Sequence, residues 1–224
     1  MIRKLKVVAF IPIKSISRRI KRKNFRTVKN KPLYAHFLNK LNKCRFDDVF
    51  VDTDSKEIIK FCKKNKINFI KRLPELASDN ANGNDLLNHH SKIIDADIYF
   101  QLFITAPLLK ISTINKCIKI LKNNKKYDSI FTAQKIYSWF WFKNQAVNYS
   151  PKILPRSQDA KPIIQETTGL YGIRKKTLKK QKCRIGKKPY LYFVNKNEAL
   201  DLDTEEDFRY LRYYVSKNLH SRKN

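Results

Sequence analysis

The chain has 224 residues, of which 42% are hydrophobic, and 49 Lys and Arg against 19 Asp and Glu give a formal net charge of +30. This length suits one large domain, and the apolar fraction can fill its core, which excludes an intrinsically disordered chain. Every apolar run is far shorter than the roughly 20 residues of a membrane span. The first residues, MIRKLKVVAFIPIK, lack the long apolar region of a signal peptide, so we expect a cytoplasmic protein without a membrane partner.

The positive charge has two interpretations. It can attract polyanions such as nucleic acid or steer anionic substrates, or it can reflect a Lys- and Asn-rich surface produced by codon bias. The basic residues are spread along the whole chain, without the aromatic signature of RNA-binding domains. We therefore do not expect a nucleic-acid partner.

The cysteines give no sign of a metal or disulfide framework. Cys44, Cys62, Cys117 and Cys183 form no CxxC pair, which argues against a zinc site. Four isolated thiols fit a reducing compartment best.

Short apolar runs alternate with amphipathic segments along most of the chain. A capping box of Asp54 and Glu57 opens one expected helix, and Thr204 with Asp207 opens the last. In chain order we predict strand Val7–Pro12, helix Pro32–Lys43, strand Asp48–Asp52, helix Asp54–Lys64, strand Asn68–Ile70, helix Asp85–Asp95, strand Ile98–Phe103, helix Thr113–Asn123, strands Ser129–Thr132, Gly169–Ile173 and Leu200–Leu202, and helix Glu205–Lys217. This alternation predicts an α/β fold with three layers and a mainly parallel, twisted sheet.

The alternation breaks between residues 134 and 162. This stretch contains both tryptophans, Trp139 and Trp141, and three of the eight prolines. We expect one domain over residues 1–224 from which 134–162 protrudes as a dimerisation arm or a lid. Exposed aromatic residues favour a subunit contact, and therefore a homodimer.

A cationic loop follows the first predicted strand, in the sequence IPIKSISRRIKRKN, with six Lys or Arg side chains from Lys14 to Lys23. The carboxyl ends of parallel strands are where open α/β sheets bind ligands. The chain has only four glycines, none in a phosphate-cradle spacing, so side-chain cations must replace a glycine-rich loop. Such a loop suits a triphosphate.

Two carboxylates lie near the C-terminal end, in ALDLDTEEDF. On an extended strand, Asp201 and Asp203 point to the same face. Paired carboxylates at a strand end can hold Mg²⁺ together with phosphate oxygens. The alternative is that Asp203 only takes part in capping the following helix.

These motifs together resemble the cytidylyltransferases that make CMP-activated acidic sugars, the group containing the N-acylneuraminate and 3-deoxy-manno-octulosonate enzymes. The resemblance runs from about Val7 to Phe208. Its motifs are IPIKSISRRIKRKN, VDTD at 51–54, RLPELASD at 72–79, FITAPLL at 103–109, ETTGLYG at 166–172 and LDLDTEED at 200–207. The resemblance implies a Rossmann-like fold of the nucleotide-diphospho-sugar transferase type, and transfer of CMP from CTP to an acidic sugar with release of pyrophosphate.

The resemblance also implies residue roles. Lys23, Arg18 and Asp203 would be catalytic, and Asp201 and Asp203 would hold Mg²⁺. The nucleotide would be bound by Lys14, Ser17, Arg18, Lys23, Asn24, Arg72, Ala77, Ser78 and Asp79. The sugar would be bound by Thr105, Arg156, Gln158, Glu166 and Tyr171, with Pro107 shaping the same side.

The departures from the family pattern concern the loop and the sugar side. Lys14 and Arg18 exchange the family's Arg and Lys, and Arg19 stands where the family has glycine. Phe103, Ile104 and Leu109 replace the Gln, Pro and Arg of the family motif QPTSPLR. Two alternatives stay open: a nucleotidyltransferase of the same architecture with another nucleotide or a neutral sugar, and a basic nucleic-acid-binding protein.

Overall fold

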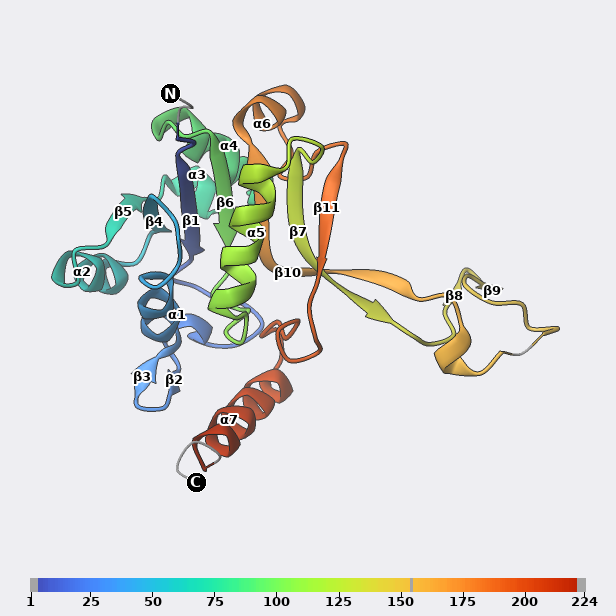
Figure 1. The fold of residues 1–224 in the computed structure, drawn as a ribbon. Helices are drawn as coiled ribbons and strands as arrows, with labels where there is room; N and C mark the ends of the chain where they lie inside the picture. The colour runs from blue at the N-terminus through green and yellow to red at the C-terminus, as the bar shows by residue number, and fades with distance from the viewer. Residues whose placement is uncertain (1–3, 154, 221–224) are drawn as a thin grey trace.

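A seven-stranded sheet forms the centre of the protein (Figure 1). The structure is a computed structural model that describes residues 4–153 and 155–220. The spatial order of the strands is β11 (Pro189–Phe193), β7 (Ser129–Ile136), β10 (Ile163–Arg174), β6 (Ile98–Leu102), β1 (Val7–Ile13), β4 (Asp48–Thr53) and β5 (Asn68–Lys71). Strand β10 runs antiparallel to β6 and β7, and every other neighbouring pair is parallel. The predicted α/β fold with a mainly parallel sheet is confirmed.

Strand β1 shows why the fold has three layers. Val7, Ala9 and Ile11 face a core shared with helices α1 (Leu33–Leu41), α2 (Lys56–Lys64) and α5 (Ile111–Asn123). Val8 and Phe10 face a second cluster shared with α4 (Gly83–Ile93) and α6 (Lys175–Gln181). A strand buried on both faces needs a continuous apolar run, and VVAFIPI supplies it.

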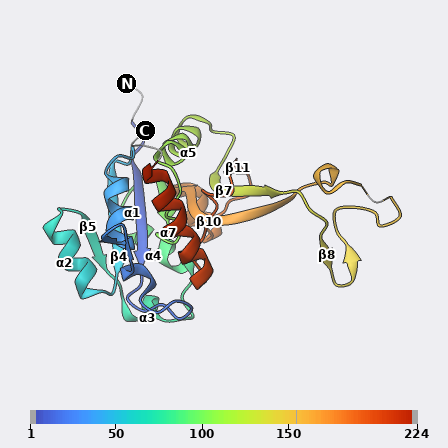
Figure 2. The ribbon, with the colours of Figure 1, turned by 90° about the horizontal axis from the view of Figure 1, so that it is seen from below.

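The remaining elements are short or lie at the edges. They are η1 (Lys23–Phe25), the hairpin β2 (Thr27–Val28) and β3 (Lys31–Pro32), α3 (Pro74–Ala77), the hairpin β8 (Trp141–Phe142) and β9 (Gln145–Ala146), η2 (Ser157–Asp159) and α7 (Glu205–His220). Helix α7 lies below the carboxyl ends of the strands in Figure 1, so that it crosses in front of them when seen from below (Figure 2). Its Phe208 and Leu211 join Ile20 of the cationic loop and Leu202 in one buried cluster.

Two local predictions are wrong, and two elements were not predicted. Helix α2 is capped by Ser55, whose hydroxyl accepts from the Ile58 N–H, whereas Asp54 turns away to the cationic loop. Residues Leu200–Leu202 form no strand, because Leu202 N–H makes an isolated bond to Thr105 C=O at 2.8 Å, while Leu200 N–H turns back to Asn197 C=O at 3.2 Å. The edge position is taken instead by β11, which the sequence analysis missed, as it missed α6.

Strands β7 and β10 continue beyond the sheet into a projecting arm (Figures 1 and 2). Their pairing extends to Ile136 opposite Ile163, and the β8–β9 hairpin lies farther out. Asn148 holds the base of that hairpin through bonds to the backbone at residues 138, 140 and 161. The arm exposes large apolar side chains: Tyr137, Trp139, Trp141, Phe142, Val147 and Ile153.

Two further features of the described chain bear on its surroundings. All four cysteines are free thiols. None of the described helices combines the length and the apolar character that crossing a bilayer requires.

The centre of β10 gives a test of packing. A Cβ placed on Gly172 would lie 2.5 Å from the Phe100 ring and 2.8 Å from Ile130 Cγ2, whereas one on Gly169 would meet its nearest neighbour at 3.0 Å. We expect Gly172→Ala to lower the free energy of unfolding by about 1–3 kcal/mol through overpacking. Gly169→Ala, in the same strand, should cost clearly less. Urea unfolding measures both, and equal stabilities of the two variants would contradict the packing described here.

Candidate active site

A pocket of about 380 Å³ opens at the carboxyl end of β1, between the cationic loop (residues 14–24) and the ELASD segment (residues 75–79). It is lined by Lys14, Ile16, Ser17, Arg18, Arg19, Lys23, Ala77 and Asp79. Six of the nine predicted nucleotide-binding residues therefore lie around one cavity. The concentration of cations makes it suitable for a polyphosphate.

Asp79 joins the two walls of this pocket. Its carboxylate accepts from Lys14 Nζ at 3.0 Å and forms an ion pair with Arg18. The hydrogen bond from Lys14 and the nearby charge of Arg18 hold the pKa of Asp79 below its usual range. Ser78 contributes its backbone carbonyl, 3.5 Å from the same ammonium. The pocket thus contains cations that already face an anion.

The shape of the cationic loop is fixed by polar contacts at its base. Asn24 donates its side-chain N–H to the Lys14 carbonyl at 2.8 Å, and Asp54 accepts from both the backbone and the hydroxyl of Ser15. The left-handed backbone conformation falls on Arg22, with φ of 54°, and not on Arg19. An arginine is therefore tolerated at position 19, because the backbone there does not need the conformational freedom of glycine.

Lys23 connects the loop to the C-terminal segment. Its side chain is buried, and Nζ donates to the Leu202 carbonyl and lies 3.4 Å from Asp203 Oδ1. Arg19 Nη1 lies 2.6 Å from the other oxygen of Asp203. Asp203 also helps to build the start of α7, because its N–H donates to Asp207. The structure thereby brings the predicted catalytic residues Lys23 and Asp203 into contact.

Asp201 lies beside β10. One carboxylate oxygen accepts from Thr168 Oγ1 at 2.6 Å, and the other, Oδ1, is buried without a hydrogen-bond partner among the described residues. The described residues contain no group of three or more His, Cys, Asp or Glu arranged to hold a metal. Mg²⁺ is commonly held by one or two carboxylates with waters and phosphate oxygens, so Asp201 and Asp203 fit it on their donor chemistry.

Arg72 does not reach the pocket wall. Its side chain is 4% exposed, and Nε lies 3.1 Å from Asp52 Oδ2, which also lies 3.0 Å from His90 Nε2. Burial opposes ionisation of Asp52, but the adjacent His90 imidazole and the charge of Arg72 outweigh it and keep the Asp52 pKa below its usual range. Burial lowers the pKa of His90. Arg72 thus fixes the start of the ELASD segment against β4.

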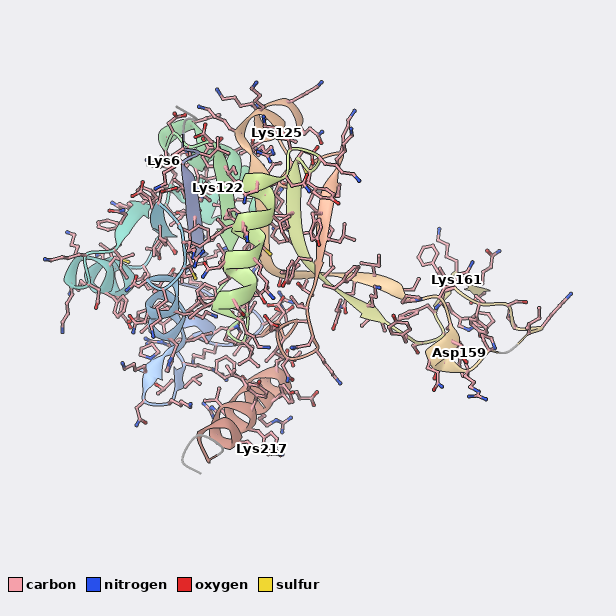
Figure 3. The ribbon with its side chains drawn as sticks, in the orientation of Figure 1. Lys6, Lys122, Lys125, Asp159, Lys161 and Lys217 are labelled. Atoms are coloured by element: carbon pink, nitrogen blue, oxygen red, sulfur yellow. The ribbon has the colours of Figure 1, made fainter. Side chains whose placement is uncertain are left out.

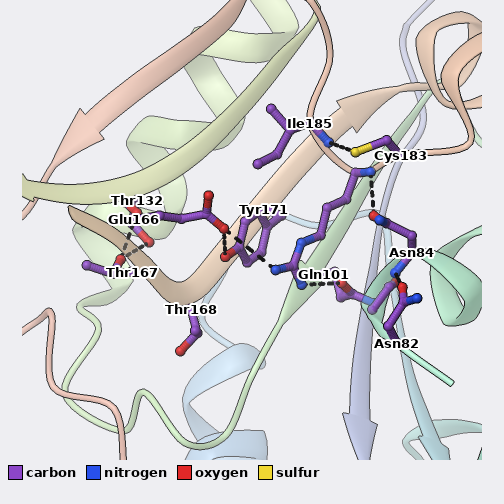
Figure 4. A network of polar contacts seen from close by, with 12 residues as sticks. Asn82, Asn84, Gln101, Thr132, Glu166, Thr167, Thr168, Tyr171, Cys183 and Ile185 are labelled. Atoms are coloured by element: carbon purple, nitrogen blue, oxygen red, sulfur yellow. Dashed lines mark hydrogen bonds and ion pairs between the residues drawn. The ribbon is translucent and has the colours of Figure 1, made fainter. Parts of the chain in front are cut away.

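A second polar cluster lies on β10, next to the sheet centre (Figure 4). Tyr171 donates its hydroxyl to Glu166, and burial together with this bond raises the Tyr171 pKa. The guanidinium of Arg184, from the loop before β11, stacks over the Tyr171 ring at 3.6 Å. Glu166 and Tyr171 were predicted as sugar contacts. Arg184 was not, because nothing in KCRIGKK marks one arginine among many cations.

The 103–109 loop joins the two clusters. The Thr105 carbonyl accepts from Leu202, one residue before Asp203. Half-buried Lys40 holds the other end of this loop by donating to the carbonyls of Pro107 and Leu109, at 3.0 and 2.7 Å. Burial lowers the pKa of Lys40 to about 8.

The other two predicted sugar contacts lie elsewhere in this chain. Arg156 and Gln158 belong to the arm, at and next to η2, where the nearby Asp159 and Lys161 are seen far from the sheet (Figure 3). The structure does not bring them to Glu166 and Tyr171 of the same chain. Basic side chains are spread over body, arm and α7, as Lys6, Lys161 and Lys217 illustrate (Figure 3).

A larger hollow lies at the other end of the molecule. It has about 710 Å³ and is lined by residues of α5 and the turn before β7, among them Lys119, Asn123 and Tyr127. These residues lie at the amino ends of the parallel strands, whereas open sheets bind ligands at the carboxyl ends. The smaller pocket is therefore the candidate active site.

Two solved structures share this fold. The chain superposes on CMP:2-keto-3-deoxy-manno-octonic acid synthetase complexed with CTP with a TM-score of 0.72 and 17% identity, over 95% of this chain and 99% of that one. It superposes on the 4-diphosphocytidyl-2C-methyl-D-erythritol synthase of Anaerococcus prevotii with a TM-score of 0.68 and 13% identity, over 95% and 97%. At these identities the likeness concerns the fold.

The sequence identifies the family. The profile of the cytidylyltransferases matches residues 8–219, so the chain belongs to the cytidylyltransferase family. It is 26% identical to N-acylneuraminate cytidylyltransferase of Streptococcus agalactiae over 91% of this chain and 52% of that protein, about half its length. It is also 26% identical to pseudaminic acid cytidylyltransferase of Campylobacter jejuni, over 96% and 98%. The resemblance recognised in the motifs is confirmed.

The buried pair of Arg72 and Asp52 gives a test of what Arg72 does. We expect Arg72→Met to lower the free energy of unfolding by about 3–5 kcal/mol, because it leaves a buried carboxylate without its cation. The double variant Asp52→Asn/Arg72→Met should recover part of this loss. Thermal and urea unfolding measure it, with the exposed Arg45→Met as control, which should stay within about 0.5 kcal/mol of wild type. Unchanged stability with a raised KM for CTP would instead put the guanidinium in the nucleotide pocket.

Proposed function

We propose that the protein transfers CMP from CTP to an acidic sugar of the sialic-acid or 3-deoxy-2-keto class and releases pyrophosphate. The observation that carries this proposal is the convergence of the cationic loop, the ELASD segment and Asp203 on one pocket. Membership of the cytidylyltransferase family supports the nucleotide. Relatives named for N-acylneuraminate and pseudaminic acid support an acidic sugar.

The loop cations are assigned to the triphosphate. Lys14, Ser17 and Arg18 line the pocket, and Asn24 keeps Lys14 in place through its backbone carbonyl. The anomeric hydroxyl of the sugar attacks the α-phosphorus in line, and negative charge grows on the departing pyrophosphate. Lys23 and Arg18 are the residues that stabilise this charge, since phosphoryl transfer relies on positioning and electrostatics more than on covalent help.

The ELASD segment is assigned to the base. Ala77, Ser78 and Asp79 lie at the rim of the pocket. Their backbone donors and acceptors are held in fixed positions and can match the edge of one base. A mismatched base leaves such groups unpaired, at a cost of about 1–3 kcal/mol each. We assign Arg72 a supporting role: it holds this segment against β4 and does not contact the nucleotide.

Mg²⁺ is assigned to Asp201 and Asp203. Bound there, it would neutralise charge on the phosphate oxygens. Asp201 Oδ1, which is buried without a hydrogen-bond partner among the described residues, supports this assignment, as do the contacts of Asp203 with Arg19 and Lys23, which line the pocket. Arg19 and Lys23 hold Asp203 in place from the side of the loop.

The sugar is assigned to the cluster on β10, with Glu166, Tyr171 and Thr105. We further propose a homodimer in which the arm of one subunit lends Arg156 and Gln158 to the sugar site of the other. The exposed aromatic side chains of the arm support this arrangement, as does the place of η2, which Arg156 precedes and whose Asp159 is seen far from the sheet (Figure 3). A cytoplasmic location is proposed because all four thiols are free.

Pyrophosphate release tests the function. We expect release with CTP and at least one of N-acetylneuraminic acid, pseudaminic acid or 3-deoxy-manno-octulosonic acid, and much slower release with UTP, ATP or GTP. The rejection of UTP should be about 10-fold or more in kcat/KM, because the cytosine N4 donor is missing. Comparable rates with UTP or ATP would remove the cytidylyl assignment. Salt-dependent RNA binding without pyrophosphate release would favour a nucleic-acid-binding protein.

The metal assignment has its own test. We expect Asp203→Asn to lower kcat by about 10²–10³-fold, the scale of losing one group that stabilises transition-state charge. Mn²⁺ binding in the presence of CTP, followed by electron paramagnetic resonance, should weaken in parallel. Glu206→Gln, an exposed carboxylate three residues on, is the matched control and should change neither. Full activity in EDTA, or a wild-type rate for Asp203→Asn, would overturn the assignment.

A further inference from the structure

Arg184 occupies a prepared position in the fold. Its backbone N–H donates to Asn84 Oδ1 at 2.9 Å, so the loop before β11 is fastened to the first turn of α4. Two residues on, the Gly186 N–H donates to Ser129 Oγ at 2.8 Å, which fastens the same loop to β7. Asn88 adds a bond to the Lys182 carbonyl at 2.8 Å. A ligand that binds Arg184 therefore does not have to order this loop.

The guanidinium is oriented but weakly engaged. It stacks on Tyr171 at 3.6 Å, which fixes its plane and leaves its N–H edge free to form hydrogen bonds. Its polar contacts are long: Nη1 lies 3.5 Å from Gln101 Oε1, and Nη2 lies 3.6 Å from Glu166 Oε1. A guanidinium has five N–H donors, and a carboxylate binds two of them at about 2.7–2.9 Å. The side chain is 23% exposed, so an anion can reach it.

The surroundings of Arg184 add to its attraction for an anion. Gly83, the first residue of α4, lies so close that a Cβ there would be 2.5 Å from Arg184 Nη1. The amino end of a helix carries a partial positive charge, which acts in the same direction as the guanidinium. Gln101 of β6 donates its Nε2–H to the Gly83 carbonyl at 3.0 Å and so holds the amino end of α4 against β6.

Arg184 contacts elements that lead toward both parts of the site, because Nη1 lies against Gly83 and the guanidinium stacks on Tyr171. On one side, Asn82 and Gly83 follow the ELASD segment of the pocket by a few residues. On the other side, Tyr171 and Glu166 lie on β10, the strand whose Thr168 donates to Asp201. Since the sugar is assigned to the cluster on β10, an acidic sugar bound there has its carboxylate within reach of the Arg184 guanidinium, which belongs to the same cluster.

We infer that Arg184 binds the carboxylate of the acidic sugar and makes the enzyme select an acid over an uncharged acceptor. This inference rests on the proposed function. Tyr171 supports the guanidinium from below, and its hydroxyl keeps Glu166 turned toward the sugar hydroxyls. The carboxylate exchanges the two long contacts of Arg184 for two short, charge-assisted hydrogen bonds.

The test compares a sugar acid with its C1 carboxamide. In wild type we expect kcat/KM for the acid to exceed that for the amide by about 100-fold, the scale of two hydrogen bonds to a charged group. Arg184→Met should remove most of this preference and leave the amide rate and the KM for CTP within about threefold. Arg184→Lys keeps the charge but not the planar fork, and should recover only part of the preference. Exposed Arg209→Met is the matched control and should behave as wild type.

Equilibrium binding of the acid in the presence of CMP gives a readout that needs no turnover. We expect Arg184→Met to weaken it by at least 10-fold with an unchanged melting temperature. Equal binding by Arg184→Met and wild type, or an undiminished acid preference, overturns the inference. So does an Arg156→Met variant that alone loses the preference, since the partner's arm would then hold the carboxylate. A wild type that binds the acid through Arg184 but releases no pyrophosphate from CTP would contradict the proposed function and leave the inference supported.

Discussion

The site depends on one buried contact between residues 179 positions apart in the chain, the ammonium of Lys23 and the carbonyl of Leu202. A buried cation is costly unless it is paired, so Lys23 can be buried only where a polar partner meets it. That partner belongs to a segment with no strand neighbours, held otherwise by Thr105 and by the cluster of Phe208 and Leu211. The cationic loop, the loop of residues 103–109 and helix α7 therefore take up their positions together.

Opposite charges face each other across the pocket. Lys14 and Arg18 meet Asp79 on one side, and Arg19 and Lys23 meet Asp203 on the other. A polyphosphate that enters this pocket would replace these carboxylates as the partner of the cations. It would therefore not meet an unbalanced positive charge. The strongly positive overall charge of the chain is thus balanced locally at this pocket. Behind it, the buried pair of Arg72 and Asp52 holds the ELASD segment against β4.

The sequence predicts the features that arise from local periodicity. Val7–Ile13 is recognisable because a strand buried on both faces must be apolar throughout, and the loop after it must then lie at the ligand-binding edge. Features that depend on distant neighbours are not recognisable. Asp54 has the spacing of a helix cap but binds Ser15. The alternation around Leu202 is typical of a strand, yet Leu202 bonds to the loop carbonyl of Thr105 and not to a neighbouring strand. Arg184 acquires its position from Asn84, far away in the sequence.

The antiparallel strand β10 has a mechanical consequence. Its outer half pairs with β7 as far as Ile163 opposite Ile136, and the register shifts between Glu166 and Tyr171. The two-stranded ribbon is thus a lever whose pivot is this irregularity, and Glu166 lies at the pivot. A load applied to the tip of the arm is transmitted along the paired strands to the Glu166 carboxylate before it reaches the remainder of the sheet. Binding of a partner to the arm therefore affects the geometry of the β10 cluster, and a stiffer ribbon couples the two more strongly.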